Sequence, residues 1–215
     1  MRRLYHFPQS TFSRRTRLAL LHKGLDVELH DARADQAVLA EARKLSPQGT
    51  MPVLVDDDRV LGDSTAIAYY LDLAYPERPL LWPRDKAQAH RAVAMTSLVD
   101  TAFNTLVEVG TRYFDLRNDP AWANIRDEKL RRARAAIDEA ARLVDPKKPF
   151  IAGDAWSVAD IWTVAATLWF AGFPARASQV VFIQQMLTLD FRVPDTLIAW
   201  AKQHESHKDV RAVFG

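Results

Sequence analysis

The chain has 215 residues, 48% of them hydrophobic and 26% charged, with a formal net charge of +2. This composition is typical of a globular protein with one large or two small domains, and it excludes a largely disordered chain. The near-neutral charge argues against nucleic acid or an anionic membrane as a partner. The absence of cysteine excludes disulfides, thiolate metal sites and a protein thiol nucleophile.

The beginning of the chain alternates between strand and helix patterns. The short apolar run 4–7 is stopped by Pro8 and predicts a strand. Residues 14–23 predict a helix that Gly24 closes, and 26–30 alternate as a half-buried strand does.

The same alternation continues to residue 75. A second helix is expected over 36–45, followed by a strand from Val53, a tight hairpin and a third helix over 64–75 that Pro76 ends. The order of these elements is that of a small α/β domain.

Three prolines, at 76, 79 and 83, mark a change of composition. Proline-rich, charged stretches are typical of linkers, so we place an α/β domain at 1–77 and a linker at 78–86. Residues 87–215 show no strand pattern and are expected to form an all-α domain. Its predicted helices cover 85–116, 121–144, 157–173 and 194–204.

Several patterns exclude other roles. The most apolar segment, 161–173, is shorter than the roughly 18 residues that suggest a membrane span, so we expect no membrane partner and a cytoplasmic protein. The charges of 121–144 are mixed, as on a solvated helix face. His204 and His207 are three residues apart instead of the four of a zinc motif, and no metal is expected.

One stretch, 46–67, has the features of a small-molecule site. Pro52 stands at the start of a strand, where its missing N–H costs no ladder bond. Asp63 and Ser64 open a helix, and a helix N-terminus offers free N–H groups and a favourable dipole to an anion.

The combined motifs resemble those of the cytosolic glutathione S-transferases. Ser46-Pro47-Gln48-Gly49-Thr50-Met51-Pro52 is similar to the family's loop into its cis-proline strand, and Asp63-Ser64-Thr65-Ala66-Ile67 to the start of its third helix. Phe150 to Ile161 resembles its capping motif, in which Ser157 and Asp160 form an acidic variant of a capping box. Pro194 to Trp200 is similar to a late helix of the family.

The resemblance implies a thioredoxin-like domain followed by an all-helical domain. It also implies an enzyme that binds glutathione as co-substrate and activates its thiol, whose free pKa is about 8.5. The stretch from Ser10 to Arg17 is similar to the Ser-type classes, including bacterial, zeta-like and tau-like members, with Ser10 as the thiolate donor. Thr11, Ser13 and Tyr5 are the alternatives, and Ser10 or Ser13 could instead only cap the helix.

The resemblance also assigns the remaining site. Met51 and Pro52 would meet the cysteinyl backbone of glutathione, Ser64 and Asp63 its γ-glutamyl end, and Thr50, Gln48 or a group on the second helix its glycine carboxylate. A pocket for a small hydrophobic electrophile would lie between the domains. Its expected lining consists of Phe7, Phe12, Phe103, Val107 and Tyr113.

Three functions fit these expectations. The first is a glutathione transferase with a detoxifying role, the second a zeta-like isomerase or lyase using the same thiolate, and the third a non-catalytic glutathione-binding or interaction module. Ser-Thr-Phe replaces the Ser-Ser-Cys of zeta isomerases at 10–12, which weakens the second. The resemblance further implies a homodimer.

Overall fold

The computed structural model describes all residues except 117 and 179, and all side chains except those and 112–115. A four-stranded sheet is built from β1 (Arg2–His6), β2 (Glu28–Asp31), β3 (Val53–Asp56) and β4 (Arg59–Gly62), in the order β2-β1-β3-β4. β1 runs parallel to β2 and antiparallel to β3, which pairs antiparallel with β4. The strands and helices of this part follow one another in the order expected from the sequence.

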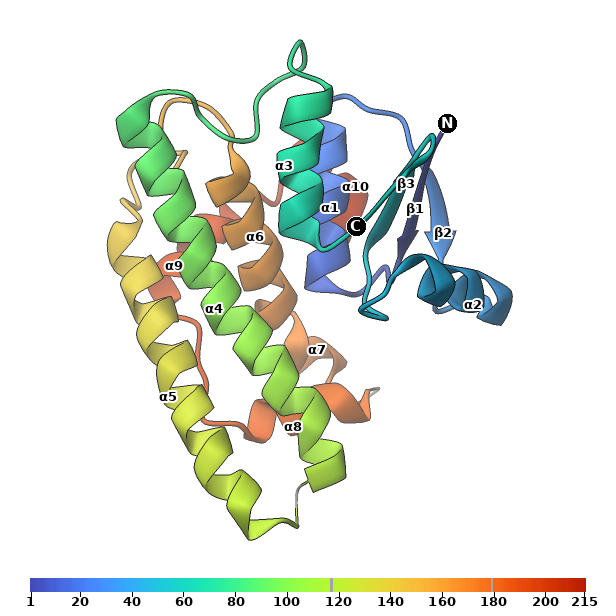
Figure 1. Cartoon of the computed structure of the whole chain (residues 1–215). Helices are drawn as coiled ribbons and strands as arrows, with labels where there is room; N and C mark the ends of the chain where they lie inside the picture. Colours follow the sequence, from blue (N-terminus) through green and yellow to red (C-terminus); the bar gives the residue numbers. More distant parts are fainter. Residues whose placement is uncertain (117, 179) are drawn as a thin grey trace.

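Three helices cover the two faces of this sheet. α1 (Thr11–His22) and α3 (Ser64–Ala74) lie on one face, and α2 (Gln36–Leu45) lies on the other (Figure 1). Successive side chains of a strand point to opposite faces. Accordingly, Leu4 belongs to the main core whereas Tyr5 packs in a smaller cluster against α2.

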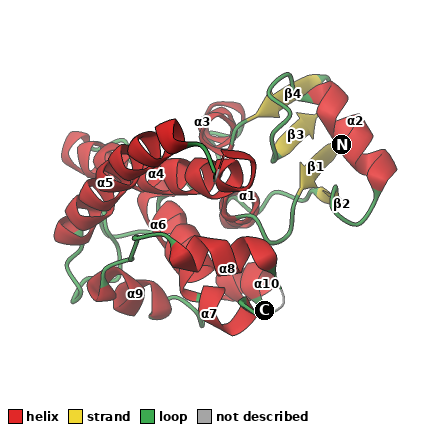
Figure 2. Ribbon diagram, turned by 90° about the horizontal axis from the view of Figure 1, so that it is seen from below, coloured by secondary structure: helices red, strands yellow, loops and turns green. Residues whose placement is uncertain are grey.

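The rest of the chain is helical over its described residues. α4 (Lys86–Leu116) and α5 (Pro120–Leu143) form a long pair, beside which α6 (Val158–Ala171) is almost wholly buried. Short helices follow: α7 (Phe173–Arg176), α8 (Val181–Thr188), α9 (Asp195–Lys202) and α10 (Lys208–Phe214). Seen from below, the sheet with α2 forms one half of the molecule and α4, α5 and α9 lie in the other (Figure 2).

The sequence did not predict α7, α8 or α10. Each has eight residues or fewer, too short to carry a repeated apolar stripe, and packing holds them in place. α8 approaches α4 closely at Gly110, where an added Cβ would lie 2.1 Å from the Met186 sulfur. α10 packs against α1.

The predicted capping box is confirmed at the start of α6. The Asp160 carboxylate accepts from the N–H groups of Ser157 and Ile151, both at 2.8 Å, and from the Ser157 hydroxyl at 2.7 Å. Burial raises the pKa of Asp160 to about 6 although these hydrogen bonds oppose the shift. The motif therefore fixes the start of a buried helix and stands apart from the site described below.

A buried ion pair ties the end of α3 to the segment before α4. The Lys23 ammonium, which is fully buried, donates to Asp72 at 2.7 Å and to the Pro79 carbonyl at 3.1 Å. The same carboxylate accepts from the N–H groups of Leu81 and Trp82. This cluster fastens the sheet-bearing part to the helices that follow.

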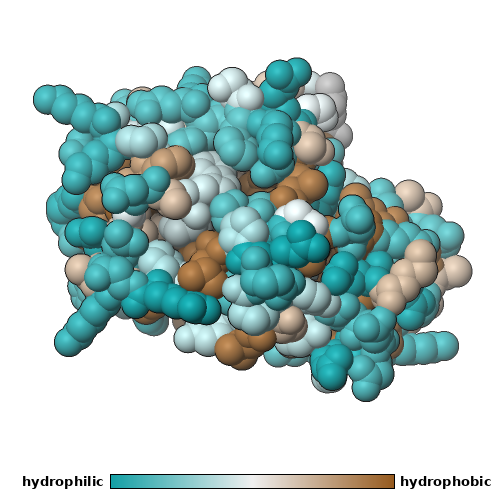
Figure 3. Space-filling view, turned by 90° about the horizontal axis from the view of Figure 1, so that it is seen from above, coloured by the Kyte–Doolittle hydropathy of each residue, from teal (hydrophilic) through white to brown (hydrophobic). Residues whose placement is uncertain are grey.

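The surface is mainly hydrophilic, with small apolar areas. Exposed apolar side chains include Tyr69 and Leu73 on α3 and Val93 on α4. Figure 3, which views the molecule from above relative to Figure 1, shows small hydrophobic areas in brown among hydrophilic ones in teal. Among the described helices, none is long and apolar enough to cross a membrane.

Candidate functional site

A cavity of about 590 Å³ lies between the sheet-bearing part and the helices. Its lining comes from the β1–α1 turn, the loops before α2 and β3, and helices α4, α6, α7 and α8. The described lining residues are Phe7, Gln9, Ser10, Thr11, Phe12, Arg33, Gly49, Thr50, Met51, Val107, Thr111, Trp169, Phe173, Arg176, Val180, Phe182 and Ile183. Most of this lining is apolar, and the hydroxyl-bearing residues Ser10 and Thr11 lie where α1 begins.

Ser10 occupies the N-cap of α1. Its N–H donates to the Phe7 carbonyl at 2.9 Å, and its own carbonyl accepts from the Arg14 N–H at 2.9 Å. The hydroxyl makes no capping bond, unlike the side chains that cap α2 and α3. A half-buried hydroxyl beside free helix N–H groups can therefore donate to an anion in the cavity.

The structure separates Ser10 and Thr11 from the other two candidate donors, Ser13 and Tyr5. Thr11 also lines the cavity, and its buried hydroxyl has no partner among the described residues. Ser13 is outside the lining and accepts from the Phe7 N–H at 3.2 Å. Tyr5 points to the α2 face, where its hydroxyl donates to Glu41 at 2.6 Å and burial with that bond raises its pKa to about 12.

The loop before β3 brings main-chain groups to the cavity. The Met51–Pro52 peptide bond is cis, as the resemblance implied. Gly49, Thr50 and Met51 line the cavity, whereas Gln48 is exposed outside the lining and Pro52 is buried behind it. Gly49 adopts a φ of +65°, which its lack of a side chain permits.

The start of α3 lies beyond this lining. Asp63 takes a φ of +67° and caps the helix, accepting from the N–H groups of Thr65 and Ala66 at 2.8 and 2.9 Å. Ser64 is buried and accepts from Arg15 Nε at 2.8 Å. Arg15 also pairs with Asp100 of α4. Neither Asp63 nor Ser64 is among the residues that line the cavity.

The apolar wall differs in part from the prediction. Phe7, Phe12 and Val107 line the cavity. Phe103 does not: it is 1% exposed and packs edge-on against Trp169 and Phe191, so the expectation that it forms the wall is corrected. The side chain of Tyr113 is outside the described residues.

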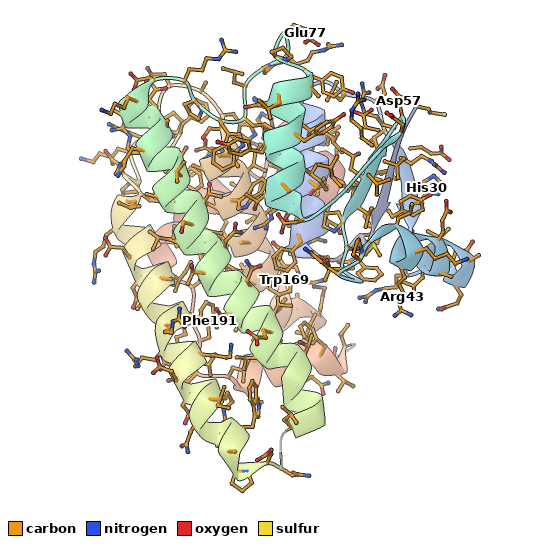
Figure 4. The ribbon with its side chains drawn as sticks, viewed as in Figure 1. His30, Arg43, Asp57, Glu77, Trp169 and Phe191 are labelled. Atoms are coloured by element: carbon orange, nitrogen blue, oxygen red, sulfur yellow. The ribbon has the colours of Figure 1, made fainter. Side chains whose placement is uncertain are left out.

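Most of the wall that sequence reasoning missed belongs to α6, α7 and α8. Trp169 and Phe182 supply aromatic surface, and Arg176 supplies a guanidinium. Figure 4 shows Trp169 beside α4 on the side toward the sheet, and Phe191 on the side toward α5. The aromatic-rich run from Trp169 to Phe182 was the available signal, but assigning it required knowing where α7 and α8 turn.

Comparison with known proteins relates the first part of the chain to one family. Residues 4–79 match the family model of the glutathione S-transferase N-terminal domain. "Glutathione S-transferase Z1" of Arabidopsis thaliana is 46% identical over 86 residues, which cover 39% of this chain and 38% of that protein. Residues 4–79 thus resemble the N-terminal domain of the glutathione S-transferases. The match thus spans about two fifths of that relative's length.

Further glutathione S-transferases match over more of the chain. "Glutathione S-transferase 2" of Anopheles gambiae is 29% identical over 180 residues, covering 80% of this chain and 82% of its own. A glutathione S-transferase from Methylobacterium radiotolerans, solved with glutathione sulfonate, superposes with a TM-score of 0.76 at 22% identity, covering 99% of this chain and 93% of its own. The glutathione S-transferase fold, with its thioredoxin-like part and helical part, therefore extends over the whole chain.

Proposed function

We propose that this protein is a glutathione S-transferase, which binds glutathione and transfers its thiolate to small hydrophobic electrophiles. The observation that carries the proposal is the composition of one cavity. It holds the uncommitted Ser10 hydroxyl at the start of α1, the loop at Met51, and an apolar wall from α4 to α8. A polar, main-chain-rich side and an apolar side in one cavity suit a peptide thiol and an apolar acceptor.

Residues 1–77 would bind glutathione, and residues 87–215 would form most of the site for the electrophile. Residues 78–86 would be the linker between the two parts. The main chain of Met51, ahead of Pro52, would pair with the cysteinyl backbone. Ser64, whose hydroxyl proton has no acceptor among the described residues, would donate to the γ-glutamyl carboxylate, with Asp63 near the ammonium. Thr50 would lie toward the glycine end, close to Arg33.

The chemistry needs a thiol with a lowered pKa. At neutral pH only a few per cent of a free thiol is ionised. Donation from the Ser10 hydroxyl and the dipole of α1 would favour the thiolate, which then attacks the electrophile held against Phe7, Phe12 and Val107. The new bond forms between sulfur and the electrophilic carbon, and a leaving group, where present, departs with its electron pair.

The similarity to glutathione S-transferases also supports two wider proposals. One is a homodimer, whose contact surface could use the exposed apolar side chains of Tyr69, Leu73 and Val93. The other is a detoxifying role in the cytoplasm. Both depend on the resemblance more than on the geometry of the cavity.

Two adjacent hydroxyl-bearing residues of the lining, Ser10 and Thr11, allow a matched test. We expect saturable binding of glutathione in the millimolar range or below, measured by calorimetry. In conjugation of a generic aryl halide, Ser10→Ala should lower kcat/KM roughly 10- to 100-fold, because it removes one hydrogen bond to a charged group. Thr11→Val should have a much smaller effect.

The outcomes separate the alternatives. No saturable glutathione binding would reject the enzyme proposal as a whole. Binding with unchanged kcat/KM in Ser10→Ala would reject Ser10 as the activating group. A loss confined to Thr11→Val would assign that role to Thr11.

A further inference from the structure

A side-chain bridge lies beside Ser10. The Gln9 Oε1 atom accepts from Arg14 Nη2 at 3.0 Å and from Arg176 Nη1 at 3.0 Å. Arg14 belongs to the first turns of α1 and Arg176 to α7, so one amide oxygen joins two guanidinium groups from distant parts of the chain. Gln9, Ser10 and Arg176 all line the cavity.

Both guanidinium groups are held in place by further contacts. Arg14 Nε donates to the Pro8 carbonyl at 3.2 Å, and the ring of Phe214 covers this guanidinium at 4.2 Å. Arg176 donates to the carbonyls of Gly172 and Trp169 at 3.2 and 3.3 Å. Their positive charges are therefore fixed relative to the Ser10 turn.

Neither charge is neutralised by the described part of the chain. No described carboxylate forms an ion pair with Arg14 or Arg176, and no Asp or Glu is among the described lining residues. The adjacent Arg15 differs, because it pairs with Asp100. A buried cation without a counter-ion is unfavourable, and an anion bound nearby relieves that cost.

The neighbouring charged groups do not supply Arg14 or Arg176 with a counter-ion. Burial lowers the pKa of Arg14 to about 10, and the charges of Arg176 and Arg17 add to the effect. Arg17 donates to a carbonyl of α10 and has no carboxylate partner among the described residues. On α10, Lys208 and Arg211 are cationic. Burial lowers the pKa of His22, at the other end of α1 from Arg14, and the Asp209 carboxylate of α10 opposes that shift.

We propose that Arg14 and Arg176, joined through Gln9, provide a positive field at the Ser10 turn that stabilises the thiolate of bound glutathione. The inference rests on the proposed function and deepens it. The thiolate would be the counter-ion that the two guanidinium groups lack. Gln9 is the positioning residue that holds both guanidinium groups. Ser10 supplies the hydrogen bond, and the bridge supplies charge that a helix N-terminus alone does not have.

The decisive variant is Gln9→Glu, which keeps the shape of the bridge and adds the missing negative charge. The measurement is the pKa of the thiol of bound glutathione, from the ultraviolet absorbance of the thiolate against pH. Because the site is partly open to solvent, Gln9→Glu and Arg176→Gln are each expected to raise that pKa by roughly 0.5–1 unit. Arg176→Lys should keep most of the wild-type value.

The rate should change less than the thiolate fraction. A thiolate with a higher pKa is more nucleophilic, so kcat/KM below the thiol pKa should fall only roughly two- to threefold, and the midpoint of the pH–rate profile should rise. Arg43→Gln is the matched control, since it removes one charge from an exposed position on α2 outside the cavity (Figure 4). It should leave the pKa and the rate unchanged.

A purely structural bridge would give the opposite pattern. Gln9→Glu would then strengthen the bridge and leave the thiol pKa unchanged, which would overturn the inference. Weaker glutathione binding with an unchanged thiol pKa would also overturn it, because the arginines would then be binding a carboxylate of the ligand. If the wild-type chain bound no glutathione, the proposed function would fail together with the inference. If the wild-type chain lowered the thiol pKa of bound glutathione and none of the variants changed that pKa, only the inference would be rejected.

Discussion

Replacing Asp72 with alanine is expected to destabilise the protein by about 3–5 kcal/mol, because it leaves the charge of Lys23 buried without its partner. Lys23 is 0% exposed, and its ammonium donates to Asp72 at 2.7 Å and to the Pro79 carbonyl at 3.1 Å. After the substitution only the carbonyl would remain as acceptor. Breaking one side of such a pair costs far more than losing an exposed ion pair, which is worth about 0–1 kcal/mol.

Two main-chain groups add to this loss. The N–H groups of Leu81 and Trp82 donate to the same carboxylate, at 3.0 and 2.8 Å. Each unpaired N–H costs about 1–3 kcal/mol where water cannot reach it, so the upper part of the range is expected. A domain is stable by only about 5–15 kcal/mol, and Asp72→Ala should therefore remove a large fraction of the total.

Urea denaturation followed by circular dichroism would measure the effect. A loss of this size corresponds to a fall of roughly 1–2 M in the urea midpoint. The double variant Lys23→Met, Asp72→Ala removes the unpaired charge and should be more stable than Asp72→Ala alone. A loss below about 1 kcal/mol, or a double variant no more stable than the single one, would show that the buried charge of Lys23 is not the cause of the destabilisation. Glu128→Ala, in an exposed pair with Arg131, is the control and should change little.

Three further predictions concern the site and the pH dependence. Tyr5→Phe should change kcat/KM for an aryl halide less than twofold, because its hydroxyl is bound to Glu41 on the other face of the sheet; a loss as large as that of Ser10→Ala would contradict the geometry. Phe182→Ala should raise the KM for an apolar acceptor roughly 5- to 10-fold without weakening glutathione binding, since it removes a half-buried ring from the apolar wall only. Burial lowers the pKa of His6 and His204 to about 4, so the stability they contribute above pH 6.5 should be lost as the pH falls toward 4. Asp160, with its pKa raised to about 6, has the opposite effect, because its contribution to stability is complete below pH 3.8 and is lost as the pH rises through 6. Plotted against pH over this range, the urea midpoints of wild type and His204→Gln should differ in slope. Equal slopes would contradict the lowered pKa of His204.

The fold was predictable where local chemistry marks the ends of elements. Pro8 ends β1, Gly24 adopts a φ of +63° after α1, and Asp63 caps α3 through its own carboxylate. These signals act within a few residues and can be read without the tertiary structure. α8 lacks such a signal, because its position depends on the close approach that Gly110 of α4 permits.

The site was predictable only in part for the same reason. The sequence places four hydroxyls near the first turn, and only the folded chain shows that Tyr5 faces α2 and that Ser13 is bound to the Phe7 main chain. Phe103 has the spacing of a wall residue, but Trp169 and Phe191 cover it. Arg176 reaches the turn from a helix about 170 residues away, a pairing with Gln9 that no local pattern encodes.

A crystal structure of the complex with glutathione is the most direct test of the central claim that this cavity activates the glutathione thiol through Ser10. We expect glutathione in the cavity, its cysteinyl backbone on the main chain of Met51 and its sulfur within hydrogen-bond reach of the Ser10 hydroxyl. Sulfur bound by Thr11 with Ser10 out of reach, or glutathione bound outside the cavity, would contradict it.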